Sequence, residues 1–385
     1  VRFRTQTTRY RRQSINSVTD KRYMALAISL GRRNLGQTSP NPSVGCVIVK
    51  NSVIVGRGCT APTGRPHAET QALNQAGLKA KGATAYITLE PCSHKGKTPP
   101  CAHALVEAGI KRTVIAVLDP DERVNGQGIS ILEAAGIEVQ VGVLEEQAFL
   151  DHAGFFFTQI KSRPFVTLKL AASIDGKIAT KEGDSKWITG TSARHFVHNM
   201  RRQHDAIMVG SGTVLSDDPS LNVRDLGECL QPARVILSSK LQISEKSNLV
   251  KTVHEQPVWI FHSSDAPEER KKSWLGKGAQ LFECPVDNAG ISIQNVLQRL
   301  ASKGITRLFC EGGGKLAASL IRSNYVDQIV TFHGGLTIGA DGLPSIHDLG
   351  ISSLTEAKRW RLDHTHSFGA EVLNIWHSVE KNSEN

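Results

Sequence analysis

The sequence contains no run of about 18 uncharged apolar residues, the length that a membrane-spanning helix needs. No apolar segment of the secretory type lies near its start. Aromatic residues make up only 5% of the 385 residues, few for a protein that stacks nucleic-acid bases. The seven cysteines are an odd number in a long chain, so they favour a reducing compartment over a disulfide framework. These absences predict a soluble, cytoplasmic protein whose cysteines bind a metal, react or pack in the core.

Positive charge is distributed unevenly along the chain, whose formal net charge is +10. Residues 1–19 contain five arginines and no acidic residue. Such a tail is typical of a disordered extension, and an organelle transit peptide is the alternative. The remaining excess is modest and suits anionic small molecules, meaning a phosphorylated substrate and cofactor.

Strand-like and helix-like segments alternate along both halves of the chain, which indicates sheets covered by helices on both faces. In the first half, strands are expected at 44–49, 85–89, 113–118 and 138–143, with helices at 22–33, from 67, at 101–108 and at 128–135. In the second half, strands are expected at 165–170, 206–209, 233–237, 258–261 and 307–310, with helices at 293–303 and 315–324. Charges and a proline interrupt the pattern at 159–164. We therefore expect a basic tail at 1–19 and α/β domains at 20–162 and 163–380.

The strongest chemical signal in the first half is His67-Ala68-Glu69, followed by Glu90-Pro91-Cys92 and Pro99-Pro100-Cys101. One imidazole and two thiolates suit zinc, and three protein ligands leave the fourth tetrahedral position to water, as in a catalytic site. Glu69 lies two residues beyond a ligand at an expected helix start, so it would lie beside the metal without binding it and could move protons.

Prolines and a second histidine complete this pattern. Pro66 and Pro100 are typical of first-turn positions, which would place the ligands at helix N-termini. His94 is a rival ligand, although its closeness to Cys92 favours a loop position. Any one of these residues alone would more often be a core histidine or a buried thiol. As a set in this order they indicate a zinc-dependent nucleobase deaminase.

The segments Ser39–Gly45, His67–Glu69 and Thr88–Cys101 together resemble the deaminase domain of the bifunctional deaminase–reductases of riboflavin biosynthesis. Eight residues separate the two cysteines, and this widened loop is a hallmark of that family. The chain departs from the family pattern at Thr60, where a histidine is frequent, and at Asp121, where asparagine is usual. The resemblance implies that the zinc ligands are His67, Cys92 and Cys101. It implies that Glu69 is the proton shuttle. It also implies that the substrate contacts are Asn41, Lys97 and Asp119.

In the second half, Glu311-Gly312-Gly313-Gly314 lies between an expected strand and an expected helix, where bare backbone amides could hold a phosphate. The run is not a G-x-G-x-x-G fingerprint, and a tight turn is the alternative. With Ala171–Ala179, Gly183–Thr189 and Val209–Arg224, it resembles the reductase domain of the same family, whose fold is similar to dihydrofolate reductase. The resemblance implies that the substrate contacts are Ser185, Arg201, Leu221, Arg224 and Glu311. It implies that the NADPH contacts are Ala171, Trp187, Thr213, Asp217 and Gly313. Lys169, on the strand that leads into this region, is a further candidate beside the two arginines that suit a sugar phosphate.

The resemblance covers nearly the whole chain and implies a fold and two reactions. A cytidine-deaminase-like three-layer α/β/α domain would deaminate 2,5-diamino-6-ribosylamino-4(3H)-pyrimidinone 5′-phosphate with a zinc-bound hydroxide. A dihydrofolate-reductase-like α/β domain would then reduce the ribosyl group with NADPH, giving 5-amino-6-(5-phosphoribitylamino)uracil, in a homo-oligomer of two or four chains. The alternatives are a zinc deaminase acting on tRNA or single-stranded DNA, a non-enzymatic protein with a structural zinc, and a chain with only one active domain.

Overall fold

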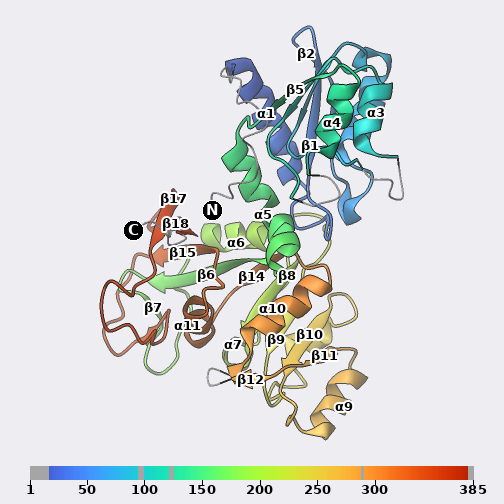
Figure 1. Ribbon diagram of the computed structural model, residues 1–385. Helices are drawn as coiled ribbons and strands as arrows, with labels where there is room; N and C mark the ends of the chain where they lie inside the picture. Colours follow the sequence, from blue (N-terminus) through green and yellow to red (C-terminus); the bar gives the residue numbers. More distant parts are fainter. Residues whose placement is uncertain (1–16, 94–98, 121–124, 288–289, 380–385) are drawn as a thin grey trace. The chain divides into compact units, whose positions relative to one another are not determined.

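The computed structural model describes residues 17–93, 99–120, 125–287 and 290–379 (Figure 1). The chain divides into two compact units between Arg163 and Pro164, inside the interruption that the sequence shows at 159–164. Among the described residues, none of the helices combines the length and apolarity that a bilayer crossing requires.

The first unit is built on a five-stranded sheet in the order β2-β1-β3-β4-β5. β1 and β2 form a hairpin whose two turn residues, Asn51 and Ser52, have φ values of 49° and 63°, which suits the twist of a two-residue hairpin. β3 runs antiparallel to β1, while β3, β4 and β5 run parallel to one another. The strands are β1 (Gly45–Lys50), β2 (Val53–Cys59), β3 (Thr84–Ile87), β4 (Arg112–Ile115) and β5 (Glu138–Val141).

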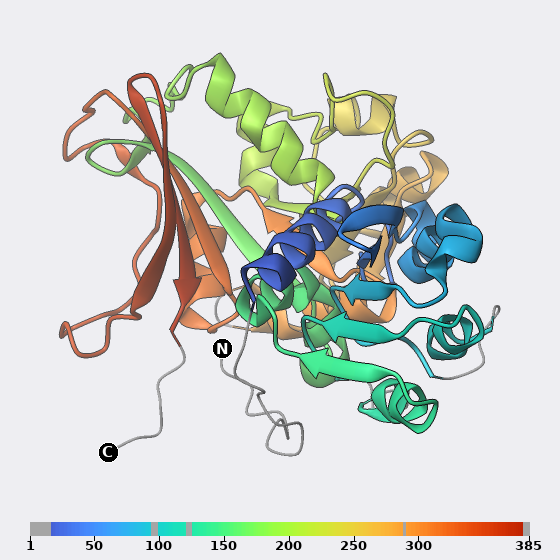
Figure 2. The same cartoon turned by 90° about the horizontal axis from the view of Figure 1, so that it is seen from above.

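Helices cover both faces of this sheet, so the unit has three layers (Figures 1 and 2). α2, α3 and α4 contact one another in series on one face, and α1 contacts α5 on the other. Gly58 in β2 brings the start of α2 against the sheet, since a Cβ there would lie 2.1 Å from the Ala68 carbonyl oxygen. The helices are α1 (Val18–Arg32), α2 (Ala68–Ala76), α3 (Cys101–Glu107), α4 (Gln127–Ala134) and α5 (Glu145–Lys161), with 3-10 turns at Pro62–Gly64 and Gly77–Ala80.

α1 begins at Val18, four residues before the start of the helix expected at 22–33. Val18 and Thr19, assigned to the tail, are helical, because the Ser17 hydroxyl accepts a hydrogen bond from the Asp20 N–H at 3.0 Å and caps the helix. The prediction that Pro66 and Pro100 lie in the first turns of their helices is also wrong by one or two residues. Pro66 precedes the N-cap of α2 and Pro100 is the N-cap of α3, so both lie just before the first turn.

The second unit is built on a nine-stranded sheet in the order β11-β10-β9-β8-β14-β6-β15-β18-β17. The strands from β11 to β15 in this order are parallel, whereas β18 and β17 are each antiparallel to the preceding strand. The strands are β6 (Phe165–Ser173), β8 (Ala206–Gly210), β9 (Ala233–Leu237), β10 (Val258–His262), β11 (Gln280–Glu283), β14 (Arg307–Cys310), β15 (Gln328–Gly334), β17 (Trp360–Phe368) and β18 (Glu371–Ser378).

Strand alternation gives this second sheet a core on each face. In β8, Ala206 and Met208 pack toward α10 and α11, while Ile207 and Val209 pack toward α6 and α9. The helices are α6 (Thr191–Arg202), α7 (Ser211–Asp217), α8 (Asn248–Lys251), α9 (Glu268–Gly276), α10 (Ile293–Ser302) and α11 (Gly314–Arg322). Short strands complete the unit at β7 (Lys177–Ala179), β12 (Val286–Asp287), β13 (Gly290–Ile291) and β16 (Leu343–Pro344).

Candidate active sites

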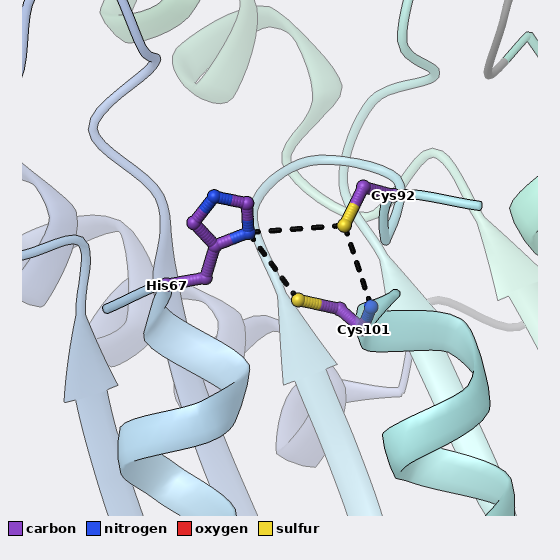
Figure 3. Close-up of side chains that lie close together, drawn as sticks. All are labelled: His67, Cys92 and Cys101. Atoms are coloured by element: carbon purple, nitrogen blue, oxygen red, sulfur yellow. Dashed lines mark hydrogen bonds between the residues drawn. The ribbon is translucent and has the colours of Figure 1, made fainter. Parts of the chain in front are cut away.

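Three elements of the first unit bring His67, Cys92 and Cys101 together (Figure 3). His67 is the N-cap residue of α2, Cys101 is the first residue of α3, and Cys92 lies in the loop after β3. The Nδ1 atom of His67 lies 3.8 Å from the Cys92 sulfur and 3.4 Å from the Cys101 sulfur. The backbone N–H of Cys101 also donates to the Cys92 sulfur at 3.3 Å, so the start of α3 orients the opposite thiol.

These distances fit a tetrahedral zinc ion. Bonds of about 2.3 Å to sulfur and about 2.0–2.1 Å to nitrogen separate the two ligand atoms by about 3.6 Å at the tetrahedral angle. The observed separations of 3.4 and 3.8 Å bracket that value. Within the part of the chain that the structure describes, this is the one group of three or more metal-type ligands that gathers so closely. The rival ligand His94 lies outside the described residues.

The two thiols share one proton when no metal is bound. A hydrogen bond from Cys101, together with the nearby imidazole, lowers the pKa of Cys92 to about 4. The same hydrogen bond to Cys92 and the burial of the site raise the pKa of Cys101. A divalent cation placed between them would replace the shared proton and stabilise both thiolates.

Glu69 lies in the first turn of α2 and its side chain is buried. Burial, reinforced by the Cys92 thiolate, raises the pKa of Glu69 to about 7. A carboxyl group with such a pKa can both take and release a proton near neutral pH. Its position in the same turn as His67 therefore gives the site a proton carrier beside the three ligands.

Two of the predicted substrate residues of this unit, Asn41 and Asp119, lie in loops. The Asn41 side-chain amide donates to the Gly64 carbonyl oxygen at 3.2 Å, and Asp119 is buried just beyond β4. Thr60, at the position where the family often has histidine, is buried and accepts a hydrogen bond from the Val44 N–H at 3.0 Å. The structure thus gives Thr60 a backbone-bonding role. Lys97 and Asp121 lie outside the described residues.

The second unit contains a cavity of about 700 Å³ at the carboxyl ends of β6, β8, β9 and β14. Chain order reverses between β8 and β14, and such a switch point is where open parallel sheets bind ligands. Eight of the predicted contact residues line the cavity: Lys169, Ala171, Ser185, Trp187, Thr213, Asp217, Glu311 and Gly313.

Charge inside this cavity centres on Lys169 and Glu311. Arg201, on α6, makes a two-point ion pair with Glu311, with N–O distances of 2.5 and 3.0 Å. Burial alone would raise the pKa of Glu311, but the Arg201 charge outweighs it and the pKa is lowered. Burial lowers the pKa of Lys169, with Glu311 and Asp217 opposing the shift. The cavity therefore presents an amine that releases its proton more readily than an exposed lysine.

The glycine run after β14 forms the start of α11. Gly312 has φ of +93°, a conformation that favours glycine. The Gly313 N–H donates to the Thr213 hydroxyl at 3.2 Å, which joins this loop to the start of α7. A Cβ on Gly314 would lie 2.6 Å from the Pro344 carbonyl oxygen. Bare backbone and helix starts thus line one wall of the cavity, a suitable surface for phosphate.

Arg201, Leu221 and Arg224 are not among the described residues that line the cavity. Arg201 reaches it through Glu311, Leu221 is buried with φ of 51°, and the Arg224 side chain is 61% exposed. Further polar residues line the cavity that were not expected there from the sequence, among them Arg194, Ser239, Lys315 and His347. Ser239 and Lys315 follow the carboxyl ends of β9 and β14, so strand position alone could have identified them. Arg194 lies with its guanidinium 4.4 Å from the Trp187 ring centre.

Fold and cluster together define a deaminase domain of the zinc-binding type joined to a reductase domain. Residues 17–117 match the family described as the cytidine and deoxycytidylate deaminase zinc-binding region, and residues 164–374 match the RibD C-terminal domain. The predicted fold classes, cytidine-deaminase-like and dihydrofolate-reductase-like, are confirmed.

The chain belongs to the RibD family, the bifunctional deaminase–reductases of riboflavin biosynthesis. It is 42% identical to the riboflavin biosynthesis protein RibD of Aquifex aeolicus over 92% of this chain and 97% of the relative. Identity to the Escherichia coli RibD protein is 36%, over 92% and 98% of the two chains. A crystal structure of a diaminohydroxyphosphoribosylaminopyrimidine deaminase/5-amino-6-(5-phosphoribosylamino)uracil reductase from Thermotoga maritima superposes with a TM-score of 0.82 at 34% identity, covering 94% of this chain and 99% of that one. The predictions of the family and of a two-activity enzyme are confirmed.

Proposed function

We propose that the first unit removes an amine from 2,5-diamino-6-ribosylamino-4(3H)-pyrimidinone 5′-phosphate, and that the second unit reduces the ribosyl group of the product with NADPH. The observation that carries the first half is the placement of one imidazole nitrogen 3.4 and 3.8 Å from two sulfurs, beside a buried carboxyl group. His67, Cys92 and Cys101 would hold zinc. When bound, zinc would supply a Lewis acid that acidifies a coordinated water.

Glu69 carries the proton transfers of deamination. It is buried in the first turn of α2, two residues from the proposed ligand His67, where it can accept a proton from water and return it to the departing amine. Because Glu69 is buried, the proton stays within the site instead of exchanging with bulk solvent.

Three further side chains bind the deaminase substrate. The Asn41 amide nitrogen donates one N–H to the Gly64 carbonyl oxygen, and its side-chain oxygen can accept from a pyrimidine N–H. Lys97 supplies a cation for the ribose phosphate. Asp119, beyond β4, binds a polar group of the same substrate.

In the second unit, Lys169 is the proton donor to the group that receives the hydride. Its amine lies in the cavity with Glu311 and Asp217, and burial lowers its pKa, which makes proton release easier. NADPH, when bound, supplies the hydride. Its contacts would be Ala171, Trp187, Thr213, Asp217 and Gly313, and the substrate contacts would be Ser185, Arg201, Leu221, Arg224 and Glu311.

We further propose that the chain forms a homo-oligomer. β17 is the outermost strand of its sheet, runs for nine residues and is exposed along most of its length. A long strand with a free edge is a ready surface for pairing with a second copy. Light scattering on the purified chain tests this, because a monomer at micromolar concentration would contradict it.

Glu69→Ala separates the two activities. Deamination should fall by about 10²-fold or more, while reduction of substrate that has already been deaminated should keep its wild-type rate. Intact deamination in this variant would refute the assignment of Glu69. Reduction that fails in the wild-type chain would instead support a chain with one active domain. A gel shift with tRNA tests the nucleic-acid alternative, which the low aromatic content disfavours.

A further inference from the structure

Glu90 is a buried carboxylate that no part of the proposed chemistry uses. Its side chain is 3% exposed, and it stands two residues before the zinc ligand Cys92. Burying a carboxylate is costly unless its oxygens are hydrogen-bonded, so the position calls for a specific set of donors.

Four backbone N–H groups supply those donors, two to each oxygen. The N–H groups of Asp119 and Gly126 donate to Oε2 at 3.3 and 3.1 Å. Those of Gly128 and Ile129 donate to Oε1 at 3.0 and 3.4 Å. One side chain therefore binds Asp119, four residues beyond the end of β4, and also the N-cap and first turn of α4.

A close backbone approach holds the same two parts together independently. A Cβ on Gly128 would lie 2.2 Å from the Pro91 carbonyl oxygen, so only glycine lets α4 begin against the loop that carries Cys92. The Glu90 N–H also donates to the Val117 carbonyl oxygen at 3.0 Å. The loop of Cys92 is thus tied to Asp119 and to α4 through both main chain and side chain.

We infer that Glu90 is a positioning residue for deamination, which acts by fixing Asp119 relative to the metal ligand Cys92. The inference rests on the proposed roles of Cys92 and Asp119. A carboxylate can accept from all four N–H groups at once, whereas a glutamine of the same shape would turn an NH₂ group toward two of them. Losing those bonds should displace Asp119 and weaken substrate binding more than the chemical step.

Glu90→Gln in the full chain tests this inference. We expect the KM of deamination to rise by about tenfold or more while kcat falls less than about threefold. Zinc content should stay near one per chain, and reduction of deaminated substrate should be unchanged. Glu133→Gln, the same change at an exposed position on α4, is the matched control. It should leave the KM and kcat of deamination, the zinc content and the rate of reduction unchanged. An unchanged KM, or a loss of zinc with kcat falling at constant KM, overturns the inference.

A second pair of variants separates this inference from the substrate role of Asp119. Asp119→Ala should itself raise KM, and adding Glu90→Gln should raise it no further, because both changes remove one effect. If Asp119→Ala raises KM and the double variant raises KM by the product of the two single effects, Glu90 does not act through Asp119. The inference about Glu90 is then refuted, while the substrate role of Asp119 stands. If Asp119→Ala leaves KM unchanged, the proposed contact between Asp119 and the substrate is refuted as well as the inference about Glu90. Should Glu90→Gln fail to fold, Gly128→Ala displaces the start of α4 and must give the same split between KM and kcat.

Discussion

The ion pair between Arg201 and Glu311 should stabilise the reductase unit as well as shape its cavity. The two side chains are 15% and 9% exposed and meet through two bonds. In Arg201→Met the Glu311 carboxylate loses its partner but stays buried, which costs about 3–5 kcal/mol at such sites. A domain of this size loses about 2–4 °C of Tm per kcal/mol, so the unfolding transition should fall by about 6–20 °C.

The pH dependence of this loss has a definite sign. Arg201 holds the pKa of Glu311 below its ordinary value, so the stability that the pair contributes is present above the unfolded-state pKa and disappears as pH falls through the folded-state pKa. The gap between wild type and Arg201→Met should therefore be full at pH 7 and narrow toward pH 4.

Calorimetric unfolding of the full chain, with deaminase inactivation followed in the same sample, provides the assay, because it does not depend on substrate binding by the reductase unit. The reductase unit of Arg201→Met should unfold at the lower temperature, while the deaminase activity should keep its wild-type midpoint. Arg224→Met is the matched control, because Arg224 is 61% exposed and its carboxylate neighbour is 4.0 Å away, a contact worth about 0–1 kcal/mol. Equal shifts for the two variants, or none for Arg201→Met, would refute the reasoning.

Two other changes have equally specific outcomes. His204 is buried between the Met200 carbonyl oxygen and the Thr167 hydroxyl, and burial lowers its pKa to about 3. The unfolded chain takes up this proton near pH 6.5, so the stability of the wild type should fall as the pH drops below 6.5. In urea unfolding measured from pH 7 to 4, His204→Gln should lose less stability over this range than the wild type. Parallel stability curves for the two proteins would contradict a buried, neutral His204. Lys169→Met should lower the kcat of reduction by about 10²-fold or more. NADPH binding, measured by cofactor fluorescence, and deamination should both stay intact. A wild-type rate of reduction would exclude Lys169 as the proton donor.

The zinc cluster was predictable because its geometry follows from local structure. A ligand just before or at a helix start, once at His67 and once at Cys101, aims its side chain out of the first turn, and the sequence shows both helices by their apolar spacing. The carboxyl group of Glu69 follows two residues later on the same turn. The sequence could not show that the Cys101 N–H donates to Cys92, since this bond depends on how α3 packs against the loop after β3.

The reductase cavity was less accessible to sequence reasoning. Its lining comes from four strand ends whose order in the sheet, with β14 inserted between β8 and β6, is set by tertiary packing. β17 and β18 could not be predicted from the sequence either. β17 is exposed along most of its length and polar at most positions, so it lacks the alternation that identifies a half-buried strand. The antiparallel strand β2 was missed although Asn51-Ser52 between two apolar runs suits a tight hairpin turn.

Metal analysis of the purified full chain, with matched serine variants, tests the account most directly. We expect one zinc ion per chain in the wild type. We expect Cys92→Ser and Cys101→Ser each to lose both the metal and deamination while reduction of deaminated substrate continues. Wild-type protein that deaminates its substrate without zinc, or serine variants that keep both metal and activity, would contradict a catalytic site built on His67, Cys92 and Cys101.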